Sequence, residues 1–485
     1  MLNTNEREWD EQYMELARRN TLTWIAVTFI LFPILVLAGV FMRFVQGNTL
    51  GSAREWFYPM MTLHGMGMVG VAYVGGMACV EQVIAKYTRP SDRVSFFAII
   101  GTVIGVVLLL VSVLIGKFAA GWYFLYPLPL KGNWPTWSAV VFLLSVTVLG
   151  ATWLIWCLDL LRAIAREYTI SKALGWHYLA GKTEPEVPPA IIITTVSLIG
   201  AVACLLSGVI VLALFYVELL TGTANDALLM KNLTFFFGHV LVNISLYLGV
   251  AVIYDVIPQY CGRPWKANKI VAISWNSVLA IVLFAYFHHL YMDFVQPTTF
   301  HYIGQIASYM SSLPAAVVTI FGALTLVFHS KMKWNMASMF LFISMVGWAI
   351  GGVAAVIDST IAVNLRFHNT LWVPAHFHTY MLEGLVLMIL GFYYHYLQEQ
   401  SQRAENHTLQ RMITGLIVVG GYGFVLMFYL AGASGVPRRF ATYPAEVGHG
   451  VPYSLVAIGF VALFSVGLAL YISEAGKCWL KAARS

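Results

Sequence analysis

The chain has 485 residues, of which 59% are hydrophobic and 10% are charged, and its mean hydropathy is +0.76. Soluble domains contain roughly 45–50% apolar and about 25% charged residues. The composition therefore excludes a water-soluble enzyme, a nucleic-acid-binding protein and a disordered scaffold. It is typical of a protein that crosses a lipid membrane many times.

Runs of about 20 apolar residues can cross roughly 30 Å of hydrocarbon as helices, because backbone groups in lipid must pair within their own segment. Twelve such runs are expected, at 22–44, 59–86, 95–115, 137–162, 189–215, 229–257, 268–290, 299–328, 335–360, 370–397, 411–432 and 452–475. We predict an all-α polytopic membrane protein, with one transmembrane domain over residues 22–485. Residues 1–21 are charged and are predicted to form an amphipathic cytoplasmic segment.

The basic residues are distributed unevenly along the predicted topology. Twenty of the 28 Lys and Arg residues lie in the N-terminal segment, the even-numbered loops and the C-terminal segment. By the positive-inside rule, both termini are expected to be cytoplasmic, which requires an even number of helices. The net charge of +6 is thus a topology signal and gives no reason to expect acidic ligands.

Histidines inside the predicted spans are the strongest functional signal. Six of the 13 histidines lie there, and ionisable groups at membrane depth are functional candidates. They are His64, His239, His288, His289, His376 and His378. At about 1.5 Å rise per residue, the topology places all six in one layer of the outer half. Six histidines from four helices at one depth point to metal binding rather than to isolated packing roles.

Helix geometry sorts these histidines into two kinds of site. His376 and His378 are about 200° apart around a helix, so they should face opposite directions and can bind different cofactors. His64 could pair with one of them as the two axial ligands of a six-coordinate heme, and the other would ligate a five-coordinate heme.

A second site is predicted on the neighbouring helices. His288 and His289 are about 100° apart around a helix and can grip one ion together. His239 would supply the third nitrogen. Three imidazoles with an open coordination position suit copper or iron.

The residues around these histidines resemble the signatures of a known family. They are Thr62-Leu63-His64-Gly65, Gly238-His239, His288-His289 and Trp372-Val373-Pro374-Ala375-His376-Phe377-His378. This set is similar to that of the catalytic subunit I of the heme-copper oxidase superfamily, and the similarity extends over essentially the whole chain. Residues 116–130, 368–370 and 436–439 resemble its B-type branch.

The resemblance implies two hemes and one distal non-heme metal, which is copper or iron. His64 and His378 would ligate the low-spin heme and His376 the high-spin heme. The distal metal would be held by His239, His288 and His289.

The resemblance also implies a surface that binds the heme propionates. Arg438 and Arg439 would pair with the propionates through charge-assisted hydrogen bonds. His368 and Asn369 would either lie at the same surface or cap an outer loop. Trp372 is expected to touch a heme edge.

One residue departs from the oxygen-reducing members of the family. Four residues after the first distal-metal histidine, B-type oxygen reductases carry a tyrosine that supplies an electron and a proton, and this chain has Asn243. Nitric oxide reductases of the superfamily have a glutamate there, and an Asn243 oxygen could play a related part. C-type oxidases place their tyrosine at the position of Val282. Tyr286 is the remaining candidate, although helix geometry should direct it elsewhere.

The expected path for cytoplasmic protons is also incomplete. Asn243, Tyr247 and Tyr254 form a partial polar stripe that Val250 interrupts, and no hydroxyl follows Pro314 until Thr319. Reduction of two NO to N2O needs only two electrons and two protons and no O–O cleavage. We therefore favour nitric oxide reduction over oxygen reduction. The sequence also leaves open a heme gas sensor without turnover and a membrane transporter.

Glu383 is an acidic residue within a predicted span. Glu383 lies five residues after His378 at membrane depth, where it either relays protons to the distal site or serves a helix contact.

The chain has no heme-attachment CxxCH and no cupredoxin Cys/Met cluster. We therefore expect electrons from a cupredoxin-like subunit II with dinuclear copper, or from a cytochrome c. The predicted location is a prokaryotic cytoplasmic membrane, with the site in its outer half.

Overall fold

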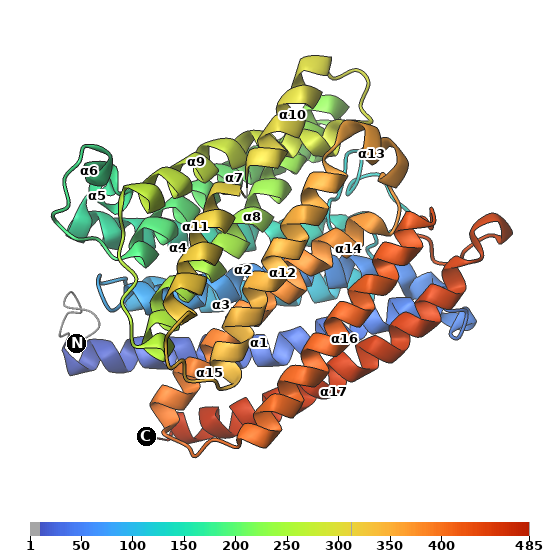
Figure 1. The fold of residues 1–485 in the computed structure, drawn as a ribbon. Helices are drawn as coiled ribbons and strands as arrows, with labels where there is room; N and C mark the ends of the chain where they lie inside the picture. Colours follow the sequence, from blue (N-terminus) through green and yellow to red (C-terminus); the bar gives the residue numbers. More distant parts are fainter. Residues whose placement is uncertain (1–9, 312, 485) are drawn as a thin grey trace.

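The computed structural model describes residues 10–311 and 313–484, and these residues form an all-helical bundle (Figure 1). Twelve helical segments are long and apolar enough to cross a membrane, as the sequence predicts. They are α1 (Glu11–Gln46), α2 (Phe57–Ile84) preceded by η1 (Gly51–Trp56), α3 (Asp92–Leu110) with η2 (Val111–Ile115), α4 (Thr136–Tyr168), α7 (Pro189–Thr221), α8 (Ala227–Cys261), α9 (Lys269–Ala285) with η3 (Tyr286–Leu290), α10 (Thr298–Ser311) with α11 (Leu313–Val327), α12 (Met336–Asp358), α14 (Trp372–His378) with η4 (Thr379–Val386) and α15 (Leu387–Ser401), α16 (His407–Ala433) and α17 (Gly450–Ala482). The short elements α5 (Ile170–Ala173), α6 (Trp176–Leu179), α13 (Ile361–Phe367) and η5 (Ala445–Val447) lie in the connections.

The first helix begins earlier than the predicted span. Asp10 caps α1 by accepting a hydrogen bond from the Tyr13 backbone N–H at 2.9 Å, which satisfies one of the unpaired donors at a helix start. Residues 11–21 are therefore the first turns of α1 and continue without a break into the apolar part of the helix. The remainder of the predicted amphipathic segment, residues 1–9, lies outside the described residues.

Two predicted spans contain local changes of helix type at the histidines. The span at 370–397 consists of α14, the π-helical segment η4 and α15. The span at 268–290 ends in η3, a 3-10 helix that carries His288 and His289. π-helical turns inside α-helices are frequent at functional sites, because they reorient the side chains that follow.

Helix α8 occupies the centre of the bundle. Of the residues in the most apolar stretch of α8, 94% are buried inside the bundle. In the corresponding stretch of the span formed by α10 and α11, the buried share is 24%. Helix–helix association in lipid depends on close packing, which small residues allow. A Cβ built on Gly249 of α8 would lie 2.6 Å from Leu385 and 2.8 Å from Met388, so this glycine lets η4 and α15 approach.

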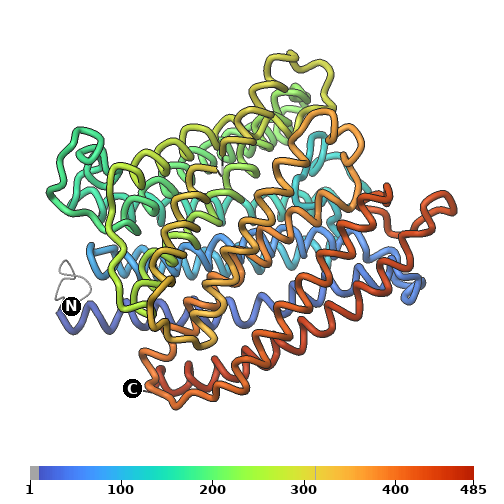
Figure 2. Tube along the Cα trace, in the orientation of Figure 1, coloured from blue at the N-terminus to red at the C-terminus, as the bar shows by residue number. Residues whose placement is uncertain are grey.

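The start of α1 and the end of α17 lie at the same end of the bundle (Figure 1). The chain trace shows the blue first helix running beside the red last helix, and α1 and α17 are in contact (Figure 2). Both α2 and η4 also contact α8, so segments far apart in sequence meet around the central helix.

Candidate metal centre

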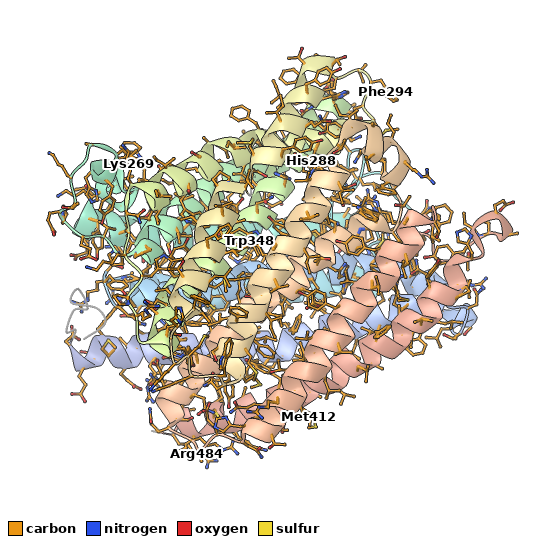
Figure 3. All side chains as sticks on the ribbon, viewed as in Figure 1. Lys269, His288, Phe294, Trp348, Met412 and Arg484 are labelled. Atoms are coloured by element: carbon orange, nitrogen blue, oxygen red, sulfur yellow. The ribbon has the colours of Figure 1, made fainter. Side chains whose placement is uncertain are left out.

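Three histidines from α8 and η3 converge on one point. One ring nitrogen from each of His239, His288 and His289 lies within 4.8 Å of the other two, and His239 Nδ1 is 3.3 Å from His289 Nε2. Within residues 10–311 and 313–484, they are the one group of three His, Cys, Asp or Glu side chains with such spacing. His288 lies toward the end of the bundle that carries Phe294 and away from Lys269 (Figure 3). This donor set fits one copper or iron ion.

A serine from α10 orients one of the three rings. Ser308 Oγ donates a hydrogen bond to Gly304 O at 2.6 Å and accepts one from His288 Nδ1 at 2.7 Å. The other ring nitrogen of His288, Nε2, is thereby left for a metal, as is usual for metal-bound histidines. The sequence did not single out Ser308, because it is one of many hydroxyl residues within the apolar spans.

Asn243 lies against the first histidine of the group. Its Nδ2 donates to His239 O at 2.9 Å and is 3.3 Å from His239 Nε2. The Nε2 edge of this imidazole therefore faces the amide, while its Nδ1 faces His289. One turn of helix brings positions i and i+4 together, as the sequence spacing indicates.

A second pair of histidines bridges α2 and α14. The rings of His64 and His378 are nearly parallel, at 18°, with centroids 6.1 Å apart. Each Nδ1 is hydrogen-bonded to a backbone carbonyl, of Leu35 at 2.8 Å and of Pro374 at 2.7 Å, so each Nε2 is left for a metal. Two imidazoles on opposite sides of one iron have centroids roughly 6 Å apart, given metal–nitrogen bonds of about 2 Å. The pair fits a six-coordinate heme.

His376 and His378 have different neighbours, as helix geometry predicts. The His378 ring packs edge-on against Phe424 and Phe428, at 5.4 and 5.6 Å. The His376 ring instead lies 5.7 Å from Tyr380 and within electrostatic reach of the three-histidine group. One helix thus contributes to both sites.

One cavity of about 940 Å³ connects these groups. All six histidines line it, together with Asn243, and its walls are mostly apolar. A large apolar cavity with a few convergent nitrogen donors is what flat, mostly hydrophobic cofactors require. The residues present therefore fit two hemes and one further metal ion.

Cationic residues line one rim of the cavity. Arg438 donates to Asn369 Oδ1 at 2.9 Å, and Arg439 lies 4.4 Å above the ring of Tyr123. The Arg439 guanidinium is buried, and because burial disfavours its charged form, its pKa is lowered to about 10. Burial and the Arg438 charge also lower the pKa of His368, which lines the same rim. Such a rim fits carboxylates of a bound cofactor.

Residues 19–465 match the family described as "Cytochrome C and Quinol oxidase polypeptide I". The chain belongs to this family. Members of the heme-copper oxidase subunit I family are catalytic oxidoreductase subunits that bind hemes and a metal, and they work in the membrane with other subunits. The twelve spanning helices agree with this fold.

The chain shares a low sequence identity with its relatives but matches them over most of its length. It is 24% identical over 404 residues to cytochrome c oxidase subunit 1 of Synechocystis sp., covering 81% of this chain and 71% of the relative. It is 23% identical over 488 residues to the same subunit of Thermus thermophilus, covering 94% and 83%. A cryo-EM structure of a heme-copper terminal oxidase dimer has a TM-score of 0.78 at 21% identity, covering 96% of this chain and 84% of that chain.

Two residues predicted for the site are not among those that line the cavity of this heme-copper oxidase subunit. Trp372 stacks on Phe367, with ring centroids 4.4 Å apart, and lies edge-on to Tyr429. Glu383 lies against α12 and α16 rather than at the three-histidine group. Sequence position gave the depth of both side chains but not their direction.

The remaining tyrosine candidate points away from the metal centre. Tyr286 donates to Asn232 Oδ1 at 3.3 Å and its ring packs on Phe236 and Phe287. Tyr380, to which no sequence motif points, lies beside His376 and accepts a hydrogen bond from Trp348 Nε1 at 3.1 Å.

Proposed function

We propose that this chain is the catalytic subunit of a membrane nitric oxide reductase, which converts two NO, two electrons and two protons into N2O and water. The observation that carries the proposal is Asn243, whose amide lies against the Nε2 edge of His239. In B-type oxygen reductases the resemblance places a redox-active tyrosine at this position. An amide cannot supply an electron and a proton for O–O cleavage.

The tyrosines that line the cavity hydrogen-bond to residues outside the three-histidine group. Tyr123, Tyr216 and Tyr380 line the cavity, but their hydroxyls are hydrogen-bonded to Arg438, Thr147 and Trp348 respectively. Tyr380 lies on the His376 side. Coupling of two NO molecules needs no such residue, because no O–O bond is broken.

The histidines have separate roles in this proposal. His64 and His378 would hold the low-spin heme and His376 the high-spin heme, while His239, His288 and His289 would hold the distal copper or iron. These groups, when bound, supply electron transfer and the binding of NO. Ser308 and Asn243 contact two of the imidazoles and would orient them, and the apolar cavity walls would keep bulk water from the reacting molecules.

The cationic rim would hold the heme propionates. Arg438, Arg439 and His368 can donate hydrogen bonds there, and the Asn369 side chain fixes Arg438. Electrons would come from the outer face of a prokaryotic cytoplasmic membrane, through a cupredoxin-like subunit with dinuclear copper or a cytochrome c. Both termini would then be cytoplasmic, with residues 1–21 as a segment on that side.

The two protons have a partial path along α8. Tyr254 Oη lies 2.9 Å from Thr319 Oγ1, so the lower part of the polar stripe is joined to α11. Val250 lies between this pair and Asn243 on α8 and offers no polar group. Two protons per turnover place a smaller demand on such a path than oxygen reduction would.

Oxygen reduction to water is the second candidate. Relatives from Synechocystis sp. and Thermus thermophilus are cytochrome c oxidase subunits, and this favours it. The two candidates share the cofactors and differ in the chemistry at Asn243.

Product analysis of the purified complex tests the proposal. With a reduced donor and NO, we expect one N2O for every two NO consumed, measured by gas chromatography, and a third metal equivalent beyond two heme irons in elemental analysis. NO consumption without N2O, or no NO consumption in a complex that contains all three metals, would overturn the proposal.

A further inference from the structure

Glu383 is a buried acid that the proposed reaction does not use. It lies in the π-helical segment η4, is 1% exposed, and neither of its carboxyl oxygens has a hydrogen-bond partner among the described residues. An ionised carboxylate in such a place is strongly disfavoured unless a positive charge compensates it. The side chain therefore has to be neutral, or ionised only while a cation is near.

Two glycines make room for this acid. A Cβ on Gly421 of α16 would overlap Glu383 Oε1, and a Cβ on Gly347 of α12 would overlap the Glu383 backbone carbonyl. The contact at Gly347 is with backbone and excludes any larger residue there, and a larger residue at position 421 would displace the Glu383 carboxyl. The sequence therefore accommodates the carboxyl at this place between α12 and α16.

The place is on the low-spin side of the cavity. Gly421 itself lines the cavity, and it is one turn from Phe424, whose ring lies 5.4 Å from that of His378. Leu382 and Val386, on either side of Glu383 in η4, line the cavity as well. Gly421, which is in contact with the Glu383 carboxyl, therefore also forms part of the cavity wall near Phe424.

Few other groups can set the charge of Glu383. From α16, Tyr422 lies in electrostatic reach, and its hydroxyl has no hydrogen-bond partner among the described residues. From α12 the contact is Gly347, and on η4 itself Tyr380 is engaged by Trp348. Among the described residues, no basic side chain lies in electrostatic reach of the Glu383 carboxyl. A cofactor at His64 and His378 would bring a variable charge to this side of the cavity.

We propose that Glu383 binds one proton when the low-spin heme held by His64 and His378 gains one electron. This inference rests on the low-spin heme site of the proposed function. A ferric heme with two neutral imidazoles has one net positive charge at its centre, and an ionised Glu383 balances it. Reduction removes that charge, so the carboxylate takes a proton from the aqueous phase. The electron comes from the donor subunit, and the only bond formed is the O–H bond of the acid.

Redox titration of the purified holoenzyme tests this proposal. The midpoint potential of the low-spin heme, followed by its optical band at several pH values, should fall as the pH rises. In Glu383→Gln we expect at least half of that pH slope to be lost. The slope should be unchanged in Glu399→Gln, which alters a half-exposed glutamate at the end of the same span.

Infrared spectroscopy gives an independent readout. The difference spectrum of the reduced minus oxidised enzyme should contain a carboxylic acid C=O band that Glu383→Gln lacks. If Glu383→Gln does not assemble, the wild-type enzyme with isotope-labelled glutamate decides, because the band must shift with the label. A pH-independent midpoint potential, an unchanged slope in Glu383→Gln, or a missing band would overturn the proposal.

These outcomes are separable from those of the proposed function. If no six-coordinate low-spin heme is present in the optical spectrum, the heme assignment to His64 and His378 is wrong and the inference about Glu383 falls with it. If that heme is present and its potential is independent of Glu383, only the inference is wrong. Whether the enzyme turns over NO or O2 affects neither readout.

Discussion

The two histidine groups of the cavity are held in place by different means. At the His64–His378 pair, each Nδ1 bonds to a backbone carbonyl of a helix. At the three-histidine group, the supporting contacts to the rings come from side chains, namely Ser308 for His288 and Asn243 for His239. Both groups lie in the same cavity and use the same donor type.

Under the proposed function, this difference would allow the reaction of the centre to change while its six histidines stay the same. Backbone carbonyls cannot be replaced by substitution, so the orientation of the His64 and His378 rings depends on the helices alone. Asn243 contacts His239 through its side chain, so a substitution at position 243 alters what stands beside this imidazole. We therefore expect the side chains around the three-histidine group to determine which gas the centre reduces.

The largest effect is expected from removing a ligand of that group. In His289→Ala, the remaining two imidazoles should not retain the distal metal, and NO turnover should fall more than about 100-fold. The optical spectrum of the low-spin heme should stay as in the wild type, because its ligands are anchored elsewhere. Loss of the low-spin spectrum would show that the two groups are not independent; His329→Ala, in a loop, serves as the control.

A smaller effect is expected from removing a side chain that orients a ligand. Ser308→Ala leaves His288 Nδ1 without its acceptor, and such changes typically lower metal affinity or activity about 10–100-fold. The measurement is retention of the distal metal after dialysis against a chelator. Ser311→Ala, one turn along α10, removes a hydroxyl that bonds the Ser308 carbonyl instead, and it should retain the metal. Equal losses in both variants would contradict a specific role for Ser308.

The smallest effect is expected at the remaining tyrosine candidate. Tyr286→Phe removes a hydrogen bond to Asn232 at 3.3 Å, outside the cavity lining, so NO turnover should change less than about twofold. A tenfold or greater loss of NO or O2 turnover would assign Tyr286 to the chemistry and reopen oxygen reduction.

The bundle and the position of the histidines could be predicted from the sequence because both follow from spacing along single helices. Apolar runs give the spans, and two residues of separation put His376 and His378 on different faces. The 3-10 geometry of η3 turns His288 and His289 roughly 120° apart, somewhat more than an α-helix gives.

Features that depend on contacts between helices could not be predicted in this way. Ser308 reaches His288 only because Gly304 lets α10 approach η3, and a Cβ there would lie 2.8 Å from His288 N. The direction of Glu383 follows from the π-helical turn and from Gly347 and Gly421, which are distant in sequence. Trp372 has the expected depth but turns toward Phe367.

The most direct test of the central claim is substrate preference in one purified sample. The complex, supplied with the same reduced donor, is measured with matched NO and O2 electrodes. The presence of Asn243 beside His239 predicts rapid NO consumption and slow O2 uptake. Rapid reduction of O2 to water, with slower NO consumption, would contradict the account and show that the enzyme cleaves O–O bonds without a tyrosine at that position.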